Sequence, residues 1–338
     1  MSLTTIPVLV KIAEKFDIYN PPNSRDLHKK KIPKLMGVVF YFGIILASFY
    51  LFKFQKGDQM LYLITALSII LYIGVRDDIY NMSPWGKITL QGIAIMIILI
   101  PQDLVLFDLH GFLGIYGLNE FMAYVLTFFI GIFMINSFNL IDGIDGLAGI
   151  MGIFMLSSFG IIFYILNDLF LVYSSVILVG TIVGYLRFNL SENKKVFMGD
   201  TGSLILGFFM FFLLLQFINH DQLGQVAFFM KQDITIWFGL LIFLYPILDS
   251  GSVFISRLKK GKSPFIPDNN HIHHLLLTKV KSHLMASLIL FGLVSFSVTL
   301  NIILYFSFFE NDRIFNPLFF VGLFVLVYLM RRSIRIDC

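Results

Sequence analysis

Long runs of apolar residues, each close to the length of one membrane crossing, constrain this chain more than any other feature. An α-helix needs about 20 apolar residues to cross the hydrocarbon layer, with a usual range of about 17–25. The sequence has about ten windows that suit this length, at residues 35–54, 59–75, 88–102, 120–137, 146–166, 169–187, 202–218, 234–255, 284–308 and 315–330. Residues 1–13 are predicted to form either the cytoplasmic half of an eleventh span or a segment at the membrane interface.

We therefore predict an all-α, polytopic integral membrane protein with about 10–11 transmembrane helices in a single domain over residues 1–338. Mean hydropathy is +0.84 and 14% of residues are charged, whereas a soluble domain carries roughly a quarter charged residues. This composition excludes a soluble enzyme with a membrane tail, and we expect membrane lipid and no nucleic acid as partners. The one cysteine, Cys338, excludes an intrachain disulfide.

The basic residues predict the orientation of these spans. When the connections are numbered alternately, only four of the 25 lysines and arginines fall on the second side, namely Lys53, Lys56, Lys231 and Arg313. The other 21 fall on the first side, with the connections at 11–34, 76–87 and 257–281 among them. Because short cytoplasmic loops carry an excess of Lys and Arg, the first side is predicted to be the cytoplasm.

Four polar clusters also fall on this predicted cytoplasmic face, at span ends. Ionisable groups beside a bilayer are costly and usually mark function. The clusters are Asp77-Asp78, the segment from Asn139 to Gly146, the segment from Met198 to Ser203, and the segment from His271 to His274. Together they favour an active site for a phosphorylated, metal-bound substrate.

The first two clusters are carboxylate-rich. Adjacent side chains on a helix point about 100° apart, so one of Asp77 and Asp78 can face a metal or nucleophile while neighbours hold the other. Asn139, Asp142 and Asp145 follow at i, i+3 and i+6, which on a helix keeps them on one broad face. The alternatives are a solvated helix-end pair for the first cluster and a glycine-rich, helix-capping turn for the second.

The third cluster, Met198-Gly199-Asp200-Thr201-Gly202-Ser203, opens a predicted span. A helix start offers free N–H groups to a phosphate, and a carboxylate beside it suits Mg²⁺. Simple capping by Asp, Thr or Ser is the alternative. Asp249 lies within a later span and is expected either to pair with a basic group or to line the site.

Histidines and lysines make up the remaining candidates. His271, His273 and His274 follow a basic stretch, and can contact phosphate or sugar, ligate zinc or lie solvated in a loop. The basic loop at 25–37 contains His28, a further substrate-binding candidate, but such a run is also expected from the positive-inside rule alone.

Taken together, the motifs resemble the polyprenyl-phosphate N-acetylhexosamine-1-phosphate transferase family. The resemblance rests on Gly-x-x-Asp-Asp at 74–78, Asn-x-x-Asp-Gly-x-Asp-Gly-Leu-Ala at 139–148, Phe-Met-Gly-Asp-Thr-Gly-Ser at 197–203 and His-Ile-His-His at 271–274. It covers about residues 17–283, and the histidine motif is similar to the bacterial sugar-1-phosphate transferase branch. Two positions depart from that branch, Asn81 in place of a third acid and Leu275 in place of an arginine.

The resemblance implies transfer of a sugar 1-phosphate, by default N-acetylglucosamine 1-phosphate, from a UDP-sugar to undecaprenyl phosphate with release of UMP. It further implies a Mg²⁺-dependent enzyme of the bacterial inner membrane, with Mn²⁺ as a substitute, a cytoplasmic site and a homodimer as one assembly. Asp200 is expected to bind the metal with Asn139 as a second ligand. Asp77 is the candidate base for the lipid phosphate, with support from Asp78, while Asp142, Asp145 and the histidines would hold the donor.

Two other functions explain part of the pattern. An ion-coupled carrier would also have many spans and carboxylates near the membrane, but it would place them near the bilayer midplane. A phosphatase acting on polyprenyl diphosphate would share Mg²⁺ and lipid but would not bind a uridine nucleotide.

Overall fold

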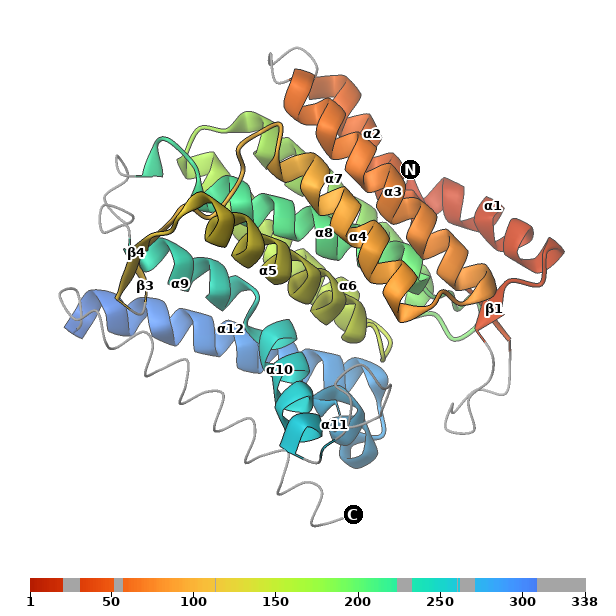
Figure 1. Ribbon diagram of the computed structural model, residues 1–338. Coiled ribbons are helices and arrows are strands. Elements are labelled where there is room, and N and C mark those ends of the chain that lie inside the picture. The colour runs from red at the N-terminus through yellow and green to blue at the C-terminus, as the bar shows by residue number, and fades with distance from the viewer. Residues whose placement is uncertain are drawn as a thin grey trace.

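The protein is a bundle of long helices with two small hairpins (Figure 1). The computed structural model describes residues 1–20, 31–51, 57–112, 114–223, 233–259, 261 and 271–308. Within these residues the elements are α1 (Ser2–Lys15), β1 (Tyr19–Asn20), β2 (Ile32–Pro33), α2 (Val38–Leu51), α3 (Gly57–Tyr80), α4 (Pro84–Leu99), β3 (Asp108–Phe112), β4 (Ile115–Gly117), α5 (Glu120–Leu140), α6 (Leu147–Ile165), α7 (Leu169–Asn189), α8 (Gly199–Ile218), α9 (Asp233–Ile242), α10 (Leu244–Lys259), α11 (Ile272–Val280) and α12 (His283–Phe308).

A helix occupies each predicted span that falls within the described residues, but not every one of these helices is long enough to cross a membrane. Six helices of the described chain, α3, α5, α6, α7, α8 and α12, are long and apolar enough to cross a membrane. The window at 234–255 corresponds to α9 and α10, which form one broken span or a re-entrant segment bent by 77°. The windows at 35–54 and 88–102 correspond to the shorter apolar helices α2 and α4, and the window at 315–330 lies outside the described residues. The chain is an all-α, multi-pass membrane protein.

Helix α8 occupies the centre of the bundle (Figure 1). Every residue from Thr201 to Ile218 is buried, and α8 packs against α2, α3, α5, α6 and α9. A helix that is apolar all round is stable only when other elements or lipid surround it. Helices α2 and α3 approach α8 closely through small residues, because a Cβ on Gly37 would overlap Gly202 and one on Gly74 would overlap Thr201.

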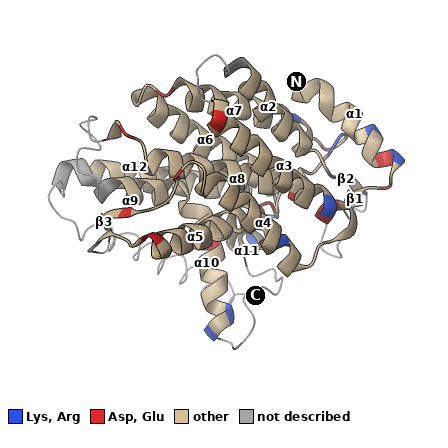
Figure 2. Ribbon diagram, turned by 45° about the horizontal axis from the view of Figure 1, so that its top comes forward, with Lys and Arg blue, Asp and Glu red and all other residues tan. Residues whose placement is uncertain are grey.

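The four polar clusters of the sequence lie at one end of this bundle. Helices α3, α5 and α7 end there, whereas α4, α6, α8 and α12 begin there (Figure 1). The β3–β4 hairpin lies at the opposite end. The Lys and Arg positions, blue on the ribbon of Figure 2, gather away from it, near α1, α4 and the far end of α10. Helix α1 begins beside the middle of α7, where the Ser2 hydroxyl donates to the Thr181 carbonyl at 2.9 Å.

Candidate active site

Two carboxylates from different helices share one lysine at the centre of the site. The Nζ atom of Lys87, in the first turn of α4, lies 3.0 Å from Oδ2 of Asp77 and 2.5 Å from Oδ2 of Asp200. Asp77 is near the end of α3, and its other oxygen accepts the Met82 N–H at 2.6 Å. One ammonium group thus offsets the negative charge of two partly buried carboxylates.

Asp78 has a different set of partners from its neighbour Asp77. Its oxygens accept the N–H of Asp200 at 3.1 Å, the N–H of Thr201 at 3.0 Å and the Thr201 hydroxyl at 2.6 Å. Through these three hydrogen bonds the buried Asp78 side chain on α3 holds the start of α8 in place. The sequence predicts that this helix start offers free N–H groups to a phosphate. For Asp200 and Thr201 that prediction is wrong, because the Asp78 carboxylate already accepts from both N–H groups.

Gly199 allows this contact between α3 and α8. It adopts φ +70°, a left-handed conformation that favours glycine. A Cβ at Gly199 would overlap the Asp78 carboxylate. The glycine of the Met-Gly-Asp motif is therefore required both by the backbone and by the close approach of Asp78.

Asn139, in the last turn of α5, is fixed beside Asp200. Its Nδ2 donates to Asp200 Oδ1 at 3.1 Å and to the Ser203 hydroxyl at 2.7 Å. With both amide hydrogens used in this way, the amide oxygen is left as a hard donor next to a carboxylate. Carboxylate and amide oxygens are the donors that Mg²⁺ prefers, so Asp200 and Asn139 fit a magnesium ion.

The acidic segment after Asn139 is a loop rather than a helix. Helix α5 ends at Leu140 and α6 begins at Leu147, so the expectation of one shared helical face for Asn139, Asp142 and Asp145 is wrong. Gly146, which follows all three residues, adopts φ +82° and precedes the first residue of α6. Burial, together with the negative charges of Asp200, Asp78 and Asp145, raises the pKa of Asp142 well above its usual value.

Asp145 forms a second charged cluster with residues from two other segments. Its Oδ2 lies 2.5 Å from Nζ of Lys195 and 3.0 Å from Nδ1 of His283, the first residue of α12. Burial favours the neutral acid, but hydrogen bonds from His283 and Lys195 outweigh it and hold the pKa of Asp145 below its usual range. The Ser287 hydroxyl also donates to the Asp145 carbonyl at 2.9 Å. This cluster joins the acidic loop to α12.

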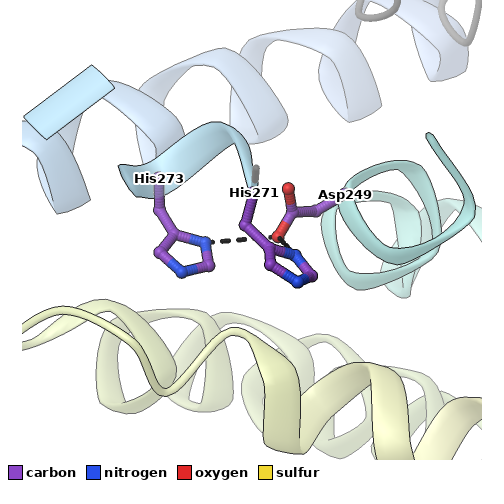
Figure 3. Close-up of side chains that lie close together, drawn as sticks. All are labelled: Asp249, His271 and His273. Atoms are coloured by element: carbon purple, nitrogen blue, oxygen red, sulfur yellow. Dashed lines mark hydrogen bonds and ion pairs between the residues drawn. The ribbon is translucent and has the colours of Figure 1, made fainter. Parts of the chain in front are cut away.

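The histidine motif is organised by Asp249 of α10 (Figure 3). Nδ1 of His271 lies 3.0 Å from Asp249 Oδ2 and Nδ1 of His273 lies 3.2 Å from the same oxygen. The Ile272 N–H donates to Oδ1 at 2.6 Å. The expectation that Asp249 either pairs or lines the site is thus resolved as a pairing with two histidines. The ligand atoms of the three residues lie within 4.8 Å of one another, which also suits a metal ion.

The histidine motif lies directly against the acidic loop. A Cβ on Gly143 would overlap Nε2 of His273 and would lie 3.1 Å from Cε1 of His274. The rings of His273 and His274 have centroids 4.3 Å apart. Burial, reinforced by the neighbouring His273 and His271, lowers the pKa of His274 to about 4, so this imidazole is neutral at pH 7.

The structure brings together nine of the ten site residues predicted from the sequence. These are Asp77, Asp78, Asn139, Asp142, Asp145, Asp200, His271, His273 and His274. The tenth, His28, lies outside the described residues. Sequence reasoning missed Lys87, Lys195 and His283. The two lysines lie at span ends on the predicted cytoplasmic face, where the positive-inside rule alone explains their charge.

The chain also resembles known proteins along most of its length. The family model of glycosyl transferase family 4 matches residues 60–218. An undecaprenyl-phosphate alpha-N-acetylglucosaminyl 1-phosphate transferase of Yersinia pestis is 31% identical over 288 residues, which cover 82% of this chain and 74% of that protein.

Two further relatives span almost the whole chain. A protein of the same name from Escherichia coli (strain K12) is 28% identical over 96% of this chain and 87% of its own length. A probable undecaprenyl-phosphate N-acetylglucosaminyl 1-phosphate transferase of Bacillus subtilis (strain 168) is 29% identical over 98% of this chain and 88% of its own length. With the motifs assembled at one end of the bundle, these matches show that the chain is a transferase and belongs to glycosyl transferase family 4.

Proposed function

We propose that this protein transfers N-acetylglucosamine 1-phosphate from UDP-N-acetylglucosamine to undecaprenyl phosphate and releases UMP. In this reaction an oxygen of the lipid phosphate forms a bond to the β-phosphorus of the donor. The bond from that phosphorus to the bridging oxygen breaks, and its electron pair leaves with UMP. The names of the relatives support the lipid acceptor and the sugar phosphate.

The arrangement of Asp77, Lys87 and Asp200 is the observation that carries this proposal. It offers one cation and two carboxylates at the end of the bundle where the polar clusters lie. A diphosphate needs cationic groups around its oxygens, and a phosphoryl transfer is accelerated mainly by positioning and by charge neutralisation. Lys87 can contact the diphosphate, while Asp200 and Asn139 would hold Mg²⁺, which would neutralise charge on the diphosphate when bound.

Asp77 is proposed to orient the lipid phosphate rather than to act as a strong base. The second pKa of a phosphomonoester is about 6, so the acceptor is largely ionised at pH 7. Asp77 is already fixed by the Met82 N–H and by Lys87. It therefore has a defined position from which to place the acceptor for attack.

The acidic loop and the histidine motif are proposed to hold the donor. Asp142 and Gly143 lie between Asp200 on one side and the histidines on the other. Asp145 anchors this loop through Lys195 and His283 rather than presenting a free carboxylate. In this proposal Asp142, His273 and His274 are the groups nearest the sugar.

The proposal is tested by measuring UMP release from purified protein in lipid. The assay supplies undecaprenyl phosphate, Mg²⁺ and a panel of UDP-N-acetylhexosamines, with and without EDTA. We expect release that needs both substrates and stops with EDTA. Release of inorganic phosphate from polyprenyl diphosphate without a nucleotide would support the phosphatase, and folded protein that binds no uridine nucleotide would support the carrier.

A further inference from the structure

Asp249 is a fully buried carboxylate that the proposed reaction does not use directly. Its two oxygens face three consecutive residues, namely Nδ1 of His271, the N–H of Ile272 and Nδ1 of His273 (Figure 3). A buried carboxylate is tolerated only when donors match its oxygens. Each of these three residues places one nitrogen against the carboxylate, and these contacts hold the start of α11 against α10.

The contacts at Nδ1 also determine which nitrogen each imidazole presents. His271 Nδ1 is hydrogen-bonded to Asp249, whereas His273 Nδ1 lies 3.2 Å from the same carboxylate oxygen and 3.4 Å from the Tyr245 hydroxyl. Because an ionised carboxylate can only accept, we assign a proton to Nδ1 of both rings. A ring that donates from Nδ1 in its neutral form has a lone pair at Nε2. Nε2 of His273 is buried and has no hydrogen-bond partner among the described residues. It lies against Gly143 of the acidic loop. A buried polar atom without a partner is costly, so its presence here points to a group supplied by a ligand.

We infer that Asp249 is a positioning residue that holds both imidazoles by their Nδ1–H groups and so presents Nε2 of His273 as an acceptor for a hydroxyl or amide hydrogen of the donor sugar. This inference rests on the proposed function, which supplies the sugar. A lone pair at Nε2 suits a hydroxyl or an N-acetyl N–H and disfavours a phosphate oxygen, which has no hydrogen to give. The histidine motif thereby reads the sugar, while Lys87 and Asp200 serve the diphosphate.

The same geometry argues against a metal ion between these three residues. A metal would take the lone pairs of both Nδ1 atoms, and the proton of each neutral ring would move to Nε2. Nε2–H of His273 would then be a buried donor without a partner. Both oxygens of Asp249 already have nitrogen donors, at 3.0 Å from His271 and 2.6 Å from the Ile272 N–H, so the hydrogen-bonded arrangement is favoured.

The tautomers can be measured directly by solid-state NMR of the full-length protein in lipid with ¹⁵N-labelled histidine. His271→Gln and His273→Gln assign the two signals by their loss. We expect a protonated Nδ1 on both rings in the wild type. An unprotonated Nδ1 on either ring overturns the inference, and so does a stoichiometric metal found by elemental analysis that Asp249→Asn removes.

Transfer kinetics test whether Asp249 acts through the sugar contact. Loss of one buried hydrogen bond should lower kcat/KM for Asp249→Asn by roughly tenfold to a hundredfold, mainly through KM for the UDP-sugar. Inhibition by UMP, which lacks the sugar, should be unchanged. Asp249→Asn added to His273→Gln should cause little further loss, because the two residues act together. A parallel loss of UMP affinity, or fully additive losses, overturns the inference.

Asp168→Asn is the matched control, because Asp168 is a buried carboxylate 3.7 Å from Nε2 of His220 at the other end of the bundle. It should keep wild-type KM for the donor, and a raised KM there would show that any lost acid–histidine pair has this effect. If wild-type protein transfers no sugar phosphate, the proposed function fails, whereas the NMR result still decides the role of Asp249.

Discussion

At the scale of single residues, Asp77 and Asp78 show how adjacent identical side chains take different roles. Asp77 contacts Lys87 and faces Asp200, whereas Asp78 is buried against the first N–H groups of α8. The motif predicts that both matter, but only the fold shows that Asp78 is needed to place Asp200. A change at either residue is therefore expected to stop the reaction for a different physical reason.

Asp77→Asn and Asp200→Asn should each reduce turnover to background, with a loss of at least roughly a hundredfold for a group that stabilises charge in the reaction. Each substitution keeps the size of the side chain, so the protein should remain folded. UMP release and thermal unfolding in detergent measure the two properties separately. Asp168→Asn serves as the control for a neutralised carboxylate, and a near-wild-type rate in either site variant would remove that residue from the mechanism.

The ion pairs of Asp145 should stabilise the fold at neutral pH and lose this effect as the pH falls. Its pKa is held below the usual value, so its ion pairs with Lys195 and His283 contribute fully above the unfolded pKa of about 3.9 and are lost as pH falls through the folded value. Asp145→Asn should cost about 3 kcal/mol at pH 7, because a buried cation loses its partner. Unfolding curves from pH 7 to pH 3 should show that difference shrinking; a constant difference would contradict this origin.

At the scale of elements, the spans were predictable because hydrophobic length is a local property, whereas the loop 141–146 was not. The i, i+3, i+6 spacing of Asn139, Asp142 and Asp145 suggests a helix, but α5 ends at Leu140, before the two acids. Lys87, Lys195 and His283 lie 10, 50 and 138 residues from the acids they contact. No local pattern gives such pairings, since they depend on how α4, α12 and the connection between α7 and α8 pack.

Gly199→Ala should damage the element that carries Asp200. Alanine at φ +70° is strained by about 1–2 kcal/mol, and its Cβ would also displace the Asp78 carboxylate. We expect lower thermal stability and a loss of transfer activity in the same variant. Gly180→Ala in α7 is the control, because a Cβ there meets no atom within 4 Å; equal damage in both variants would refute the explanation.

At the scale of the whole molecule, alternating helix directions collect all the polar clusters at one end. The described lysines and arginines gather away from the β3–β4 hairpin (Figure 2), which matches the excess of basic residues expected on the cytoplasmic side. We therefore propose that the site faces the cytoplasm of a bacterial inner membrane. A second copy of the chain remains compatible with the exposed apolar helix faces.

Cysteine labelling should establish this orientation. In a Cys338→Ser background, Lys194→Cys lies at the end with the site and Asp108→Cys lies in the hairpin at the other end. A membrane-impermeant maleimide is added to intact spheroplasts, whose inner membrane is accessible from outside. It should label Asp108→Cys, and it should reach Lys194→Cys only after the membrane is permeabilised. The reverse pattern would place the site outside.

Helix α8 both carries a residue of the candidate site and forms the centre of the bundle. Its first turn carries Asp200 and its remaining length is buried on every side. Substitutions along α8 therefore disturb the centre of the bundle, whatever they do to the substrate. The edge formed by Gly143, His273 and His274 belongs to a loop and a short helix that can vary without unpacking that centre. Divergence towards other N-acetylated sugars, in nature or by directed evolution, is thus expected to proceed along this edge while α8 stays fixed.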